Sequence, residues 1–322
     1  MSDPAKRPPV RVAVFGAAGG IGSSIAFNLC MRLPGAEIVL VDTNTAMAES
    51  HAMDLLDVLA LGEAPTVRLG TAADAVDADV VVISAGVALH SMPSRAEFLD
   101  ANAAIVAEVA DPLAAAGWRG SMLIMTNPVD ALVTWVQRRT GIDRYRIIGY
   151  TLNDTLRLRT AIASQLEVHP ATVDAWVLGE HGGTHLPVFS RVMVEGRPVE
   201  LDAAQREAAR DYVDGWFARH ARLDVRRSSA WTSGAGGAEL VDAMVSGQSS
   251  PLPGSIVLDG EYGISGAAVS VPLVFDPAGD ARVIEWTLSA EESSALSDAA
   301  RRVGATAEQV GSGLPVSEWR LG

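Results

Sequence analysis

Residues 12–22 read Val-Ala-Val-Phe-Gly-Ala-Ala-Gly-Gly-Ile-Gly, and an apolar, helix-compatible run follows from Ser23 to Met31. This order predicts a strand, a glycine turn and a helix. Glycines suit such a turn because it is tight, and because the backbone must approach a pyrophosphate without a Cβ in the way. The first amides of the helix, at the positive end of its dipole, then face the phosphates. The stretch favours a dinucleotide site, although the same glycines also fit an ordinary tight turn.

Asp42 supports the nucleotide interpretation. It follows the apolar run Glu37–Val41 and lies twenty residues beyond Gly22. At that spacing a carboxylate can hold the ribose hydroxyls, and it also repels a 2′-phosphate. The sequence therefore favours NAD over NADP, with a simple strand cap as the alternative role for Asp42.

Short runs that are apolar throughout recur along the first half of the chain and alternate with helix-compatible stretches. They are Val10–Phe15, Glu37–Val41, Asp79–Ser84 and Ser121–Met125. Strands that are apolar rather than alternating are typical of a parallel sheet covered on both faces. The first half is therefore predicted to be an α/β domain with a Rossmann-type doubly wound parallel sheet.

The pattern changes from about Tyr150 and predicts an α+β second half. Helices are expected at Thr151–Leu166, Asp202–His220 and Ser289–Val303, and strands at Val173–Leu178, Val188–Val194, Ser255–Leu258 and Ala267–Val274. Glu195-Gly196 and Asp259-Gly260 suit turns between antiparallel strands. With roughly 150 residues per domain, 322 residues predict two domains. We expect an NAD-binding domain over residues 1–149 and a second, α+β domain over 150–322.

Composition excludes several classes of partner. The formal net charge of −14 argues against nucleic acid and anionic membranes, because both need clustered Lys and Arg. Cys30 is the single cysteine, which rules out an intramolecular disulfide and favours a reducing compartment. Residues 1–9 lack an apolar stretch of the signal-peptide type, and no run reaches the length of a membrane span. These features predict a cytoplasmic protein.

Four motifs fall in the order and spacing of the lactate/malate dehydrogenase family, which the chain resembles nearly throughout, to about Val303. They are Val-Ile-Ser-Ala-Gly at 82–86, Thr-Asn-Pro-Val-Asp at 126–130, Asn153-Asp154 with Arg157, and Gly-Glu-His-Gly at 179–182. The glycine turn looks more like the malate branch of this family. The Gly-Glu-His-Gly motif looks more like the lactate branch.

The resemblance implies an NAD-dependent oxidoreductase that interconverts an L-2-hydroxy acid and its 2-oxo acid. Such a reaction needs a base with a pKa near neutrality, and His181 would take the hydroxyl proton. By likeness, Asp154 would accept a hydrogen bond from the other ring nitrogen of His181, and Arg157 would grip the substrate carboxylate. Arg95 would swing in with the preceding loop and polarise the reacting carbonyl. Asn127 would donate a hydrogen bond to the substrate oxygen.

The resemblance also assigns cofactor contacts and an assembly. The expected cofactor-binding residues are Gly16, Gly19, Ile21, Gly22, Asp42, Ala85, Gly86, Asn102 and Asn127. No cluster of side chains has the spacing of a metal site, so none is expected. A homodimer or homotetramer is implied, because the family pairs its subunits through helices.

One position departs from the family. Six residues before Arg95, malate enzymes generally carry a second arginine and lactate enzymes a glutamine, whereas this chain has Leu89. A leucine cannot neutralise a second carboxylate, so the substrate side chain should be uncharged unless His90 or His185 supplies the charge. Ser229 is expected on the opposite wall of that pocket. Malate and an uncharged 2-hydroxy acid both stay open as substrates.

Gly183 stands where the family often has an aspartate after Gly-Glu-His-Gly, which would loosen the segment that carries His181.

Two other functions are possible. An NAD-binding sensor of the same fold without catalysis is one, although the complete set of His181, Asp154, Arg157 and Arg95 argues against it. The other is a glycosidase that uses NAD and a Cys/His-bound metal. It would need a cysteine near the domain junction, and Cys30 lies elsewhere.

Overall fold

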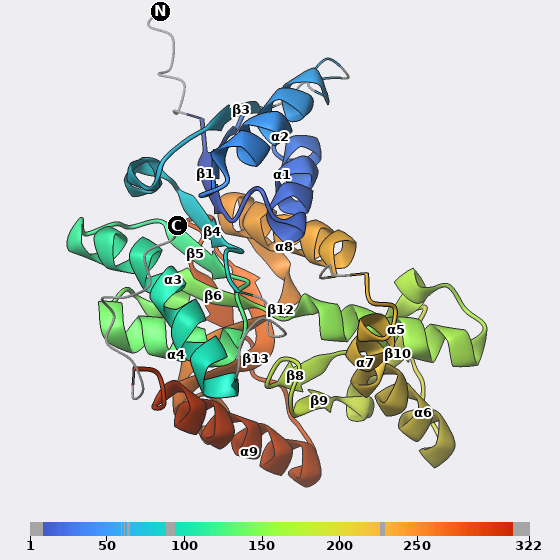
Figure 1. Ribbon diagram of the computed structural model, residues 1–322. Coiled ribbons are helices and arrows are strands. Elements are labelled where there is room, and N and C mark those ends of the chain that lie inside the picture. Colours follow the sequence, from blue (N-terminus) through green and yellow to red (C-terminus); the bar gives the residue numbers. More distant parts are fainter. Residues whose placement is uncertain are drawn as a thin grey trace, which may run out of the picture.

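The computed structural model describes residues 9–58, 60, 62, 65–87, 94–225 and 229–311. The first half forms a parallel sheet with strand order β3-β2-β1-β4-β5-β6 (Figure 1). The strands are β1 (Arg11–Phe15), β2 (Glu37–Val41), β3 (Thr66–Leu69), β4 (Val80–Ile83), β5 (Ser121–Ile124) and β6 (Ile147–Tyr150). The connecting helices are α1 (Gly20–Arg32), α2 (Thr45–Val58), α3 (Arg95–Ala115) and α4 (Val129–Thr140).

Both faces of this sheet are covered, which explains its uniformly apolar strands. Alternate residues of β1 belong to two separate buried clusters: Val12 and Val14 pack with α1 and α8, whereas Ala13 and Phe15 pack with α3 and α4. A doubly wound, Rossmann-type sheet is therefore confirmed.

The second half extends the same sheet. Strand β12 (Gln248–Asp259) pairs with β6 in antiparallel fashion, and the order continues through β13 (Ser265–Phe275), β8 (Val177–Gly179) and β9 (His185–Pro187), with β14 (Ala281–Val283) on β13. A small second sheet contains β7 (Val173–Asp174), β10 (Met193–Val194) and β11 (Arg197–Pro198). The helices are α5 (Leu152–Leu166), α6 (Ala203–Asp214), α7 (Trp216–Ala221), α8 (Ala230–Ser246) and α9 (Ala290–Ala307). The predicted α+β second half is confirmed.

Three predicted elements of the second half are wrong in detail. The strand expected at 188–194 contains a 3-10 turn at Phe189–Arg191, where Glu292 accepts the Ser190 hydroxyl at 2.8 Å and turns the chain. The strand expected at 173–178 divides into β7 and β8, since the carbonyl of Ala175 accepts a bond from Arg159. The helix expected at 202–220 divides at Gly215, a residue with poor helix propensity.

Within the described part of the chain, none of the helices combines the length and apolar character needed to cross a membrane.

Helices α1 and α8 lie side by side although they come from opposite halves of the sequence (Figure 1). Their close approach depends on Gly234 in α8. A Cβ atom at Gly234 would overlap the side chain of Ser24 in α1.

Gly234→Ala should therefore lower the free energy of unfolding by about 1–3 kcal/mol, because the added methyl group overpacks this contact. The same substitution at Gly304 in α9 is the control, since its Cβ would lie 3.9 Å from the nearest atom. Gly304→Ala should be neutral or stabilise by about 0.5–1 kcal/mol. Urea unfolding of both variants measures the difference, and equal midpoints would contradict the packing argument.

Candidate active site

The predicted cofactor residues gather at one edge of the parallel sheet. Gly16 follows β1, Asp42 follows β2, Gly86 follows β4 by three residues, and Asn127 follows β5. All lie at the carboxyl ends of these strands. The strand order reverses between β1 and β4, and such a switch point is where open α/β sheets bind ligands.

The glycine turn has no room for side chains at two positions. Gly16 has φ of +84°, and a Cβ there would lie 2.5 Å from the backbone nitrogen of Ala85. A Cβ at Gly22 would overlap the carbonyl oxygen of Gly16. No described side chain caps α1 at Gly19, which is exposed, so the helix N-terminus is open to an anion. The turn thus fits the pyrophosphate of a dinucleotide.

Asp42 ties this turn to the end of β2. Its Oδ2 accepts the Ala18 amide at 2.9 Å, and its Oδ1 accepts the Asn44 amide at 2.9 Å. Each carboxylate oxygen has a second lone pair, so the residue can still accept hydroxyl groups. Ile21 is half-buried in the first turn of α1.

Buried Asn102 links two loops of the cofactor edge. Its Oδ1 accepts the Val87 amide at 2.8 Å, and its Nδ2 donates to the Asn127 carbonyl at 2.7 Å. A Cβ at Gly86 would lie 2.9 Å from the Asn102 oxygen. Asn102 therefore fixes the backbone of both loops, while Asn127 itself is exposed.

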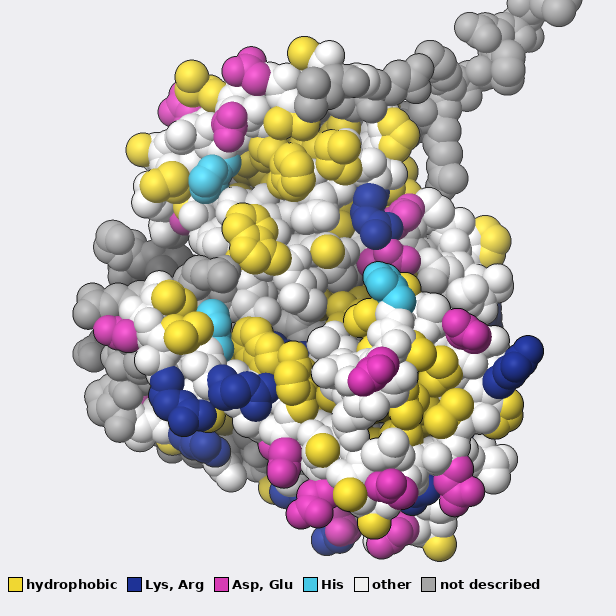
Figure 2. Space-filling model, turned by 90° about the vertical axis from the view of Figure 1, so that its right-hand side faces the viewer, with side chains coloured by type: hydrophobic (Ala, Val, Ile, Leu, Met, Phe, Trp, Pro, Cys, Tyr) yellow, Lys and Arg dark blue, Asp and Glu magenta, His cyan; other side chains and the backbone are white. Residues whose placement is uncertain are grey.

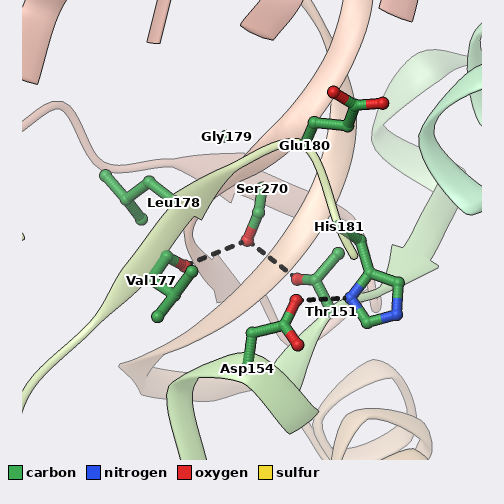
Figure 3. Close-up of a pocket in the computed structure, with 8 residues that line it drawn as sticks. All are labelled: Thr151, Asp154, Val177, Leu178, Gly179, Glu180, His181 and Ser270. Atoms are coloured by element: carbon green, nitrogen blue, oxygen red, sulfur yellow. Dashed lines mark hydrogen bonds and ion pairs between the residues drawn. The ribbon is translucent and has the colours of Figure 1, made fainter. Parts of the chain in front are cut away.

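His181, Asp154 and Arg157 form one cluster, part of which Figure 3 shows. Nδ1 of His181, which follows β8, lies 2.7 Å from Oδ2 of Asp154 in the first turn of α5 (Figure 3). The other oxygen of Asp154 accepts Nη1 of Arg157, one helical turn later, at 3.0 Å. The predicted base, its orienting acid and the carboxylate-binding arginine are thus brought together.

Two hydroxyl groups hold the elements beneath this cluster. Thr151, just before α5, and Ser270 of β13 are 2.8 Å apart, and Ser270 also donates to the carbonyl of Val177 in β8 (Figure 3). These bonds fix the start of α5 against the strand that leads to His181.

The charges of the cluster support one another. Burial acts to lower the pKa of His181, but the Asp154 carboxylate outweighs it and the net pKa is raised. Burial acts to raise the pKa of Asp154, yet His181 and Arg157 lower it to about 2. His181 consequently keeps its proton to a higher pH than a free imidazole does, opposite an ionised Asp154.

Asp130, the last residue of the motif at 126–130, has a position in the site that was not predicted from the sequence. This buried acid accepts the backbone amide of His181 at 2.6 Å. Burial raises its pKa to about 6. The sequence feature that could have indicated it is an acidic residue within the otherwise apolar run Val129–Val133 at the start of α4. Asp130 holds the backbone of His181, whereas Asp154 holds its ring.

Arg157 also lines a cavity of about 120 Å³ between β9 and α6. The lining residues are Asp154, Arg157, Gly182, Gly183, His185, Val213, Asp214 and Phe217. Nε2 of His185 lies 2.7 Å from Oδ1 of Asp214, so an acid already neighbours this histidine. A Cβ at Gly183 would lie 2.9 Å from the carboxyl carbon of Glu180.

Four predicted residues stand apart from the cluster or lie outside the described residues. Arg95 is exposed at the first position of α3. Leu89 and His90 lie outside the described residues. Ser229 is half-buried directly before α8. Among the described residues no group of His, Cys, Asp and Glu is arranged to hold a metal ion.

Asp130→Asn should change the pH dependence of stability. Because the folded pKa of this carboxyl is raised from 3.8 to about 6, ionisation weakens the fold as pH rises through that range. Asparagine keeps an acceptor for the His181 amide and does not ionise. The free energy of unfolding of the variant, relative to that of the parent, should therefore increase by about 2 kcal/mol between pH 4 and pH 8. Thermal unfolding at both pH values measures this, and a constant difference would refute it.

Comparison with known proteins agrees with this geometry. Residues 10–149 match the family model described as lactate/malate dehydrogenase, NAD binding domain, and residues 151–312 match the alpha/beta C-terminal domain of the same family. L-lactate dehydrogenase 2 of Lactiplantibacillus plantarum is 34% identical over 289 residues, which cover 86% of this chain and 91% of the relative. Malate dehydrogenase of Halobacterium salinarum is 31% identical over 303 residues, which cover 93% and 99%.

A solved structure has the same architecture. The minor L-lactate dehydrogenase from Enterococcus mundtii, in its ligands-bound form, aligns with a TM-score of 0.86 at 29% identity and covers 94% of this chain and 99% of that one. The chain therefore belongs to the lactate/malate dehydrogenase family of NAD-dependent 2-hydroxy acid oxidoreductases.

Proposed function

We propose that His181 removes the hydroxyl proton of an L-2-hydroxy acid during oxidation and returns it to the 2-oxo acid during reduction. The observation that carries this proposal is the contact of His181 Nδ1 with Asp154 at 2.7 Å. It leaves Nε2 of the ring for the substrate and stabilises the imidazolium. When bound at the glycine turn, NAD supplies the hydride acceptor.

Arg157 would bind the substrate carboxylate. Its side chain is 17% exposed, and one nitrogen bonds Asp154, which leaves other N–H groups for a two-pronged contact. In this proposal Asn127 donates to the reacting oxygen, and Arg95 approaches it from the start of α3. The cofactor contacts are those of the glycine turn, Asp42 and the loops that Asn102 joins.

We favour a 2-hydroxy acid with an uncharged side chain as the substrate. Leu89, at the position that reads the side chain by likeness, offers no charge for a second carboxylate. His185 is a weak substitute, because Asp214 lies 2.7 Å from its ring nitrogen. Ser229 would form the opposite wall. Malate is the alternative substrate, with His90 as the remaining candidate cation.

The assembly would be a homodimer or homotetramer. Large hydrophobic side chains are exposed on α1 and α2, among them Met31 at 62% and Met53 at 64%, and hydrophobic side chains gather over this region in the upper part of Figure 2. An apolar face of this kind suits a second copy of the chain.

Two further assignments belong to the same proposal. The division at residues 149 and 150 would separate the NAD-binding domain from the catalytic domain. A cytoplasmic location fits the single cysteine, Cys30, which is buried and free.

Turnover of a graded panel of 2-oxo acids tests the reaction and the substrate. With NADH, pyruvate and 2-oxoisocaproate should exceed oxaloacetate by about 100-fold or more in kcat/KM, because an unpaired buried carboxylate is disfavoured by several kcal/mol. His181→Asn, the control, should lose at least about 100-fold in kcat. A preference for oxaloacetate would establish the malate alternative. No turnover at all, with NADH still bound, would favour the non-catalytic NAD-binding protein.

The pH profile tests the pair of His181 and Asp154. Reduction needs protonated His181, so kcat/KM for the 2-oxo acid should be full at low pH and fall as pH rises through the raised pKa. Oxidation of the hydroxy acid needs neutral His181, so its kcat/KM should rise with pH through the same pKa. Asp154→Asn removes the carboxylate that raises this pKa, so the midpoint for reduction should move to lower pH. An unmoved midpoint would argue that another group carries the proton.

A further inference from the structure

The guanidinium of Arg157 lies on the face of Trp216. The Cζ atom is 4.0 Å from the centroid of the indole ring. Trp216 is the first residue of α7, directly after the glycine that ends α6, and its ring also stacks on His220 with centroids 5.1 Å apart and planes 15° apart. The arginine that meets the substrate carboxylate in the proposed function is thus held by an aromatic surface from another element.

The two contacts of Arg157 use different parts of its guanidinium. A guanidinium that stacks on a ring contacts it through its flat face, whereas all its N–H bonds lie in the plane and point outward from its edge. Asp154 takes one of these edge bonds through Nη1. Trp216 restrains the plane and Asp154 restrains rotation within it. The remaining edge is left in the fork geometry that fits a carboxylate.

Three other arginine and tryptophan pairs among the described residues lack this setting. Arg139 lies 5.1 Å from the ring of Trp135, and Arg191 lies 4.2 Å from that of Trp286, and both of these arginines are exposed. Arg159, half-buried and 5.6 Å from the ring of Trp176, bonds the carbonyl of Ala175 and the carboxylate of Asp174 instead of reaching the cluster. Arg157 is largely buried, lines the cavity beside Gly182 and contacts the acid that orients His181.

We propose that Trp216 is a positioning residue for substrate binding: by stacking on Arg157 it fixes the plane in which the guanidinium receives the substrate carboxylate. This inference rests on the proposed role of Arg157. It adds a residue from α7 to the binding apparatus, although Trp216 donates no bond to the substrate.

Trp216→Leu tests the inference, because it keeps apolar bulk and removes the aromatic face. KM for the best 2-oxo acid should rise by roughly 3- to 30-fold while kcat changes little, which is the signature of lost ground-state binding. Trp216→Phe should restore most of the affinity, since a ring face remains. Trp135→Leu, which disrupts the contact of half-buried Trp135 with the exposed Arg139 on α4, should leave KM unchanged. Thermal unfolding midpoints and NADH affinity are measured for each variant.

A double-mutant cycle with Arg157→Lys tests whether Trp216 acts through Arg157. Lysine lacks the planar fork, so Trp216→Leu should have a much smaller effect on KM in that background. An equal effect in both backgrounds would overturn the proposal. So would a fall in kcat and in the unfolding midpoint at unchanged KM that phenylalanine does not rescue.

Binding of oxamate to the enzyme with NADH separates this inference from the proposed reaction. Oxamate is an unreactive isostere of a small 2-oxo acid, and calorimetry measures its affinity without turnover. Weaker binding by Trp216→Leu supports the role of Trp216 even if no 2-oxo acid is reduced. Equal affinity in both proteins, or no binding to either, overturns it.

Discussion

The buried carboxylate of Asp154 is the constraint on which the rest of the site depends. Its two oxygens face His181 and Arg157, so a charge far from water is balanced from both sides. Loss of one partner would leave uncompensated charge in a dry environment, which is unfavourable by several kcal/mol. Asp154 and Arg157 of α5 must therefore keep a fixed position relative to His181 at the end of β8. Hydrogen bonds made by Ser270 and Asp130 hold these elements in place.

The two halves of the chain contribute different parts of this arrangement. Parallel strands of the first half place glycine and asparagine backbones at one edge, where a dinucleotide fits. The antiparallel extension brings β8, and His181 with it, to the same region through β12 and β13. Asp130 connects the two, because it belongs to α4 of the first half and bonds the His181 amide of the second. The site thus exists only where the halves meet.

Sequence reasoning predicted the parallel sheet well because its strands are buried on both faces. It missed β3, which is partly exposed, and β6, whose four residues include Gly149. It also predicted His181, Asp154 and Arg157, since closely spaced motifs carry them. The contacts of Trp216 and Asp214 were not predictable, because both flank the helix break at Gly215, and periodicity alone gave one continuous helix there. Contacts between residues of separate elements have no characteristic spacing in the sequence from which they could be predicted.

The pairing of β6 with β12 has a mechanical consequence. Gly254 and Ser255 are bonded in register with Tyr150 and Gly149, so backbone hydrogen bonds cross the junction between the halves. A hinge that opened the halves like a book would have to break this ladder at its centre. Any movement during a catalytic cycle is therefore expected in elements outside the sheet. The glycine turn and His181 both follow strands of this sheet, so we expect the distance between them to change little.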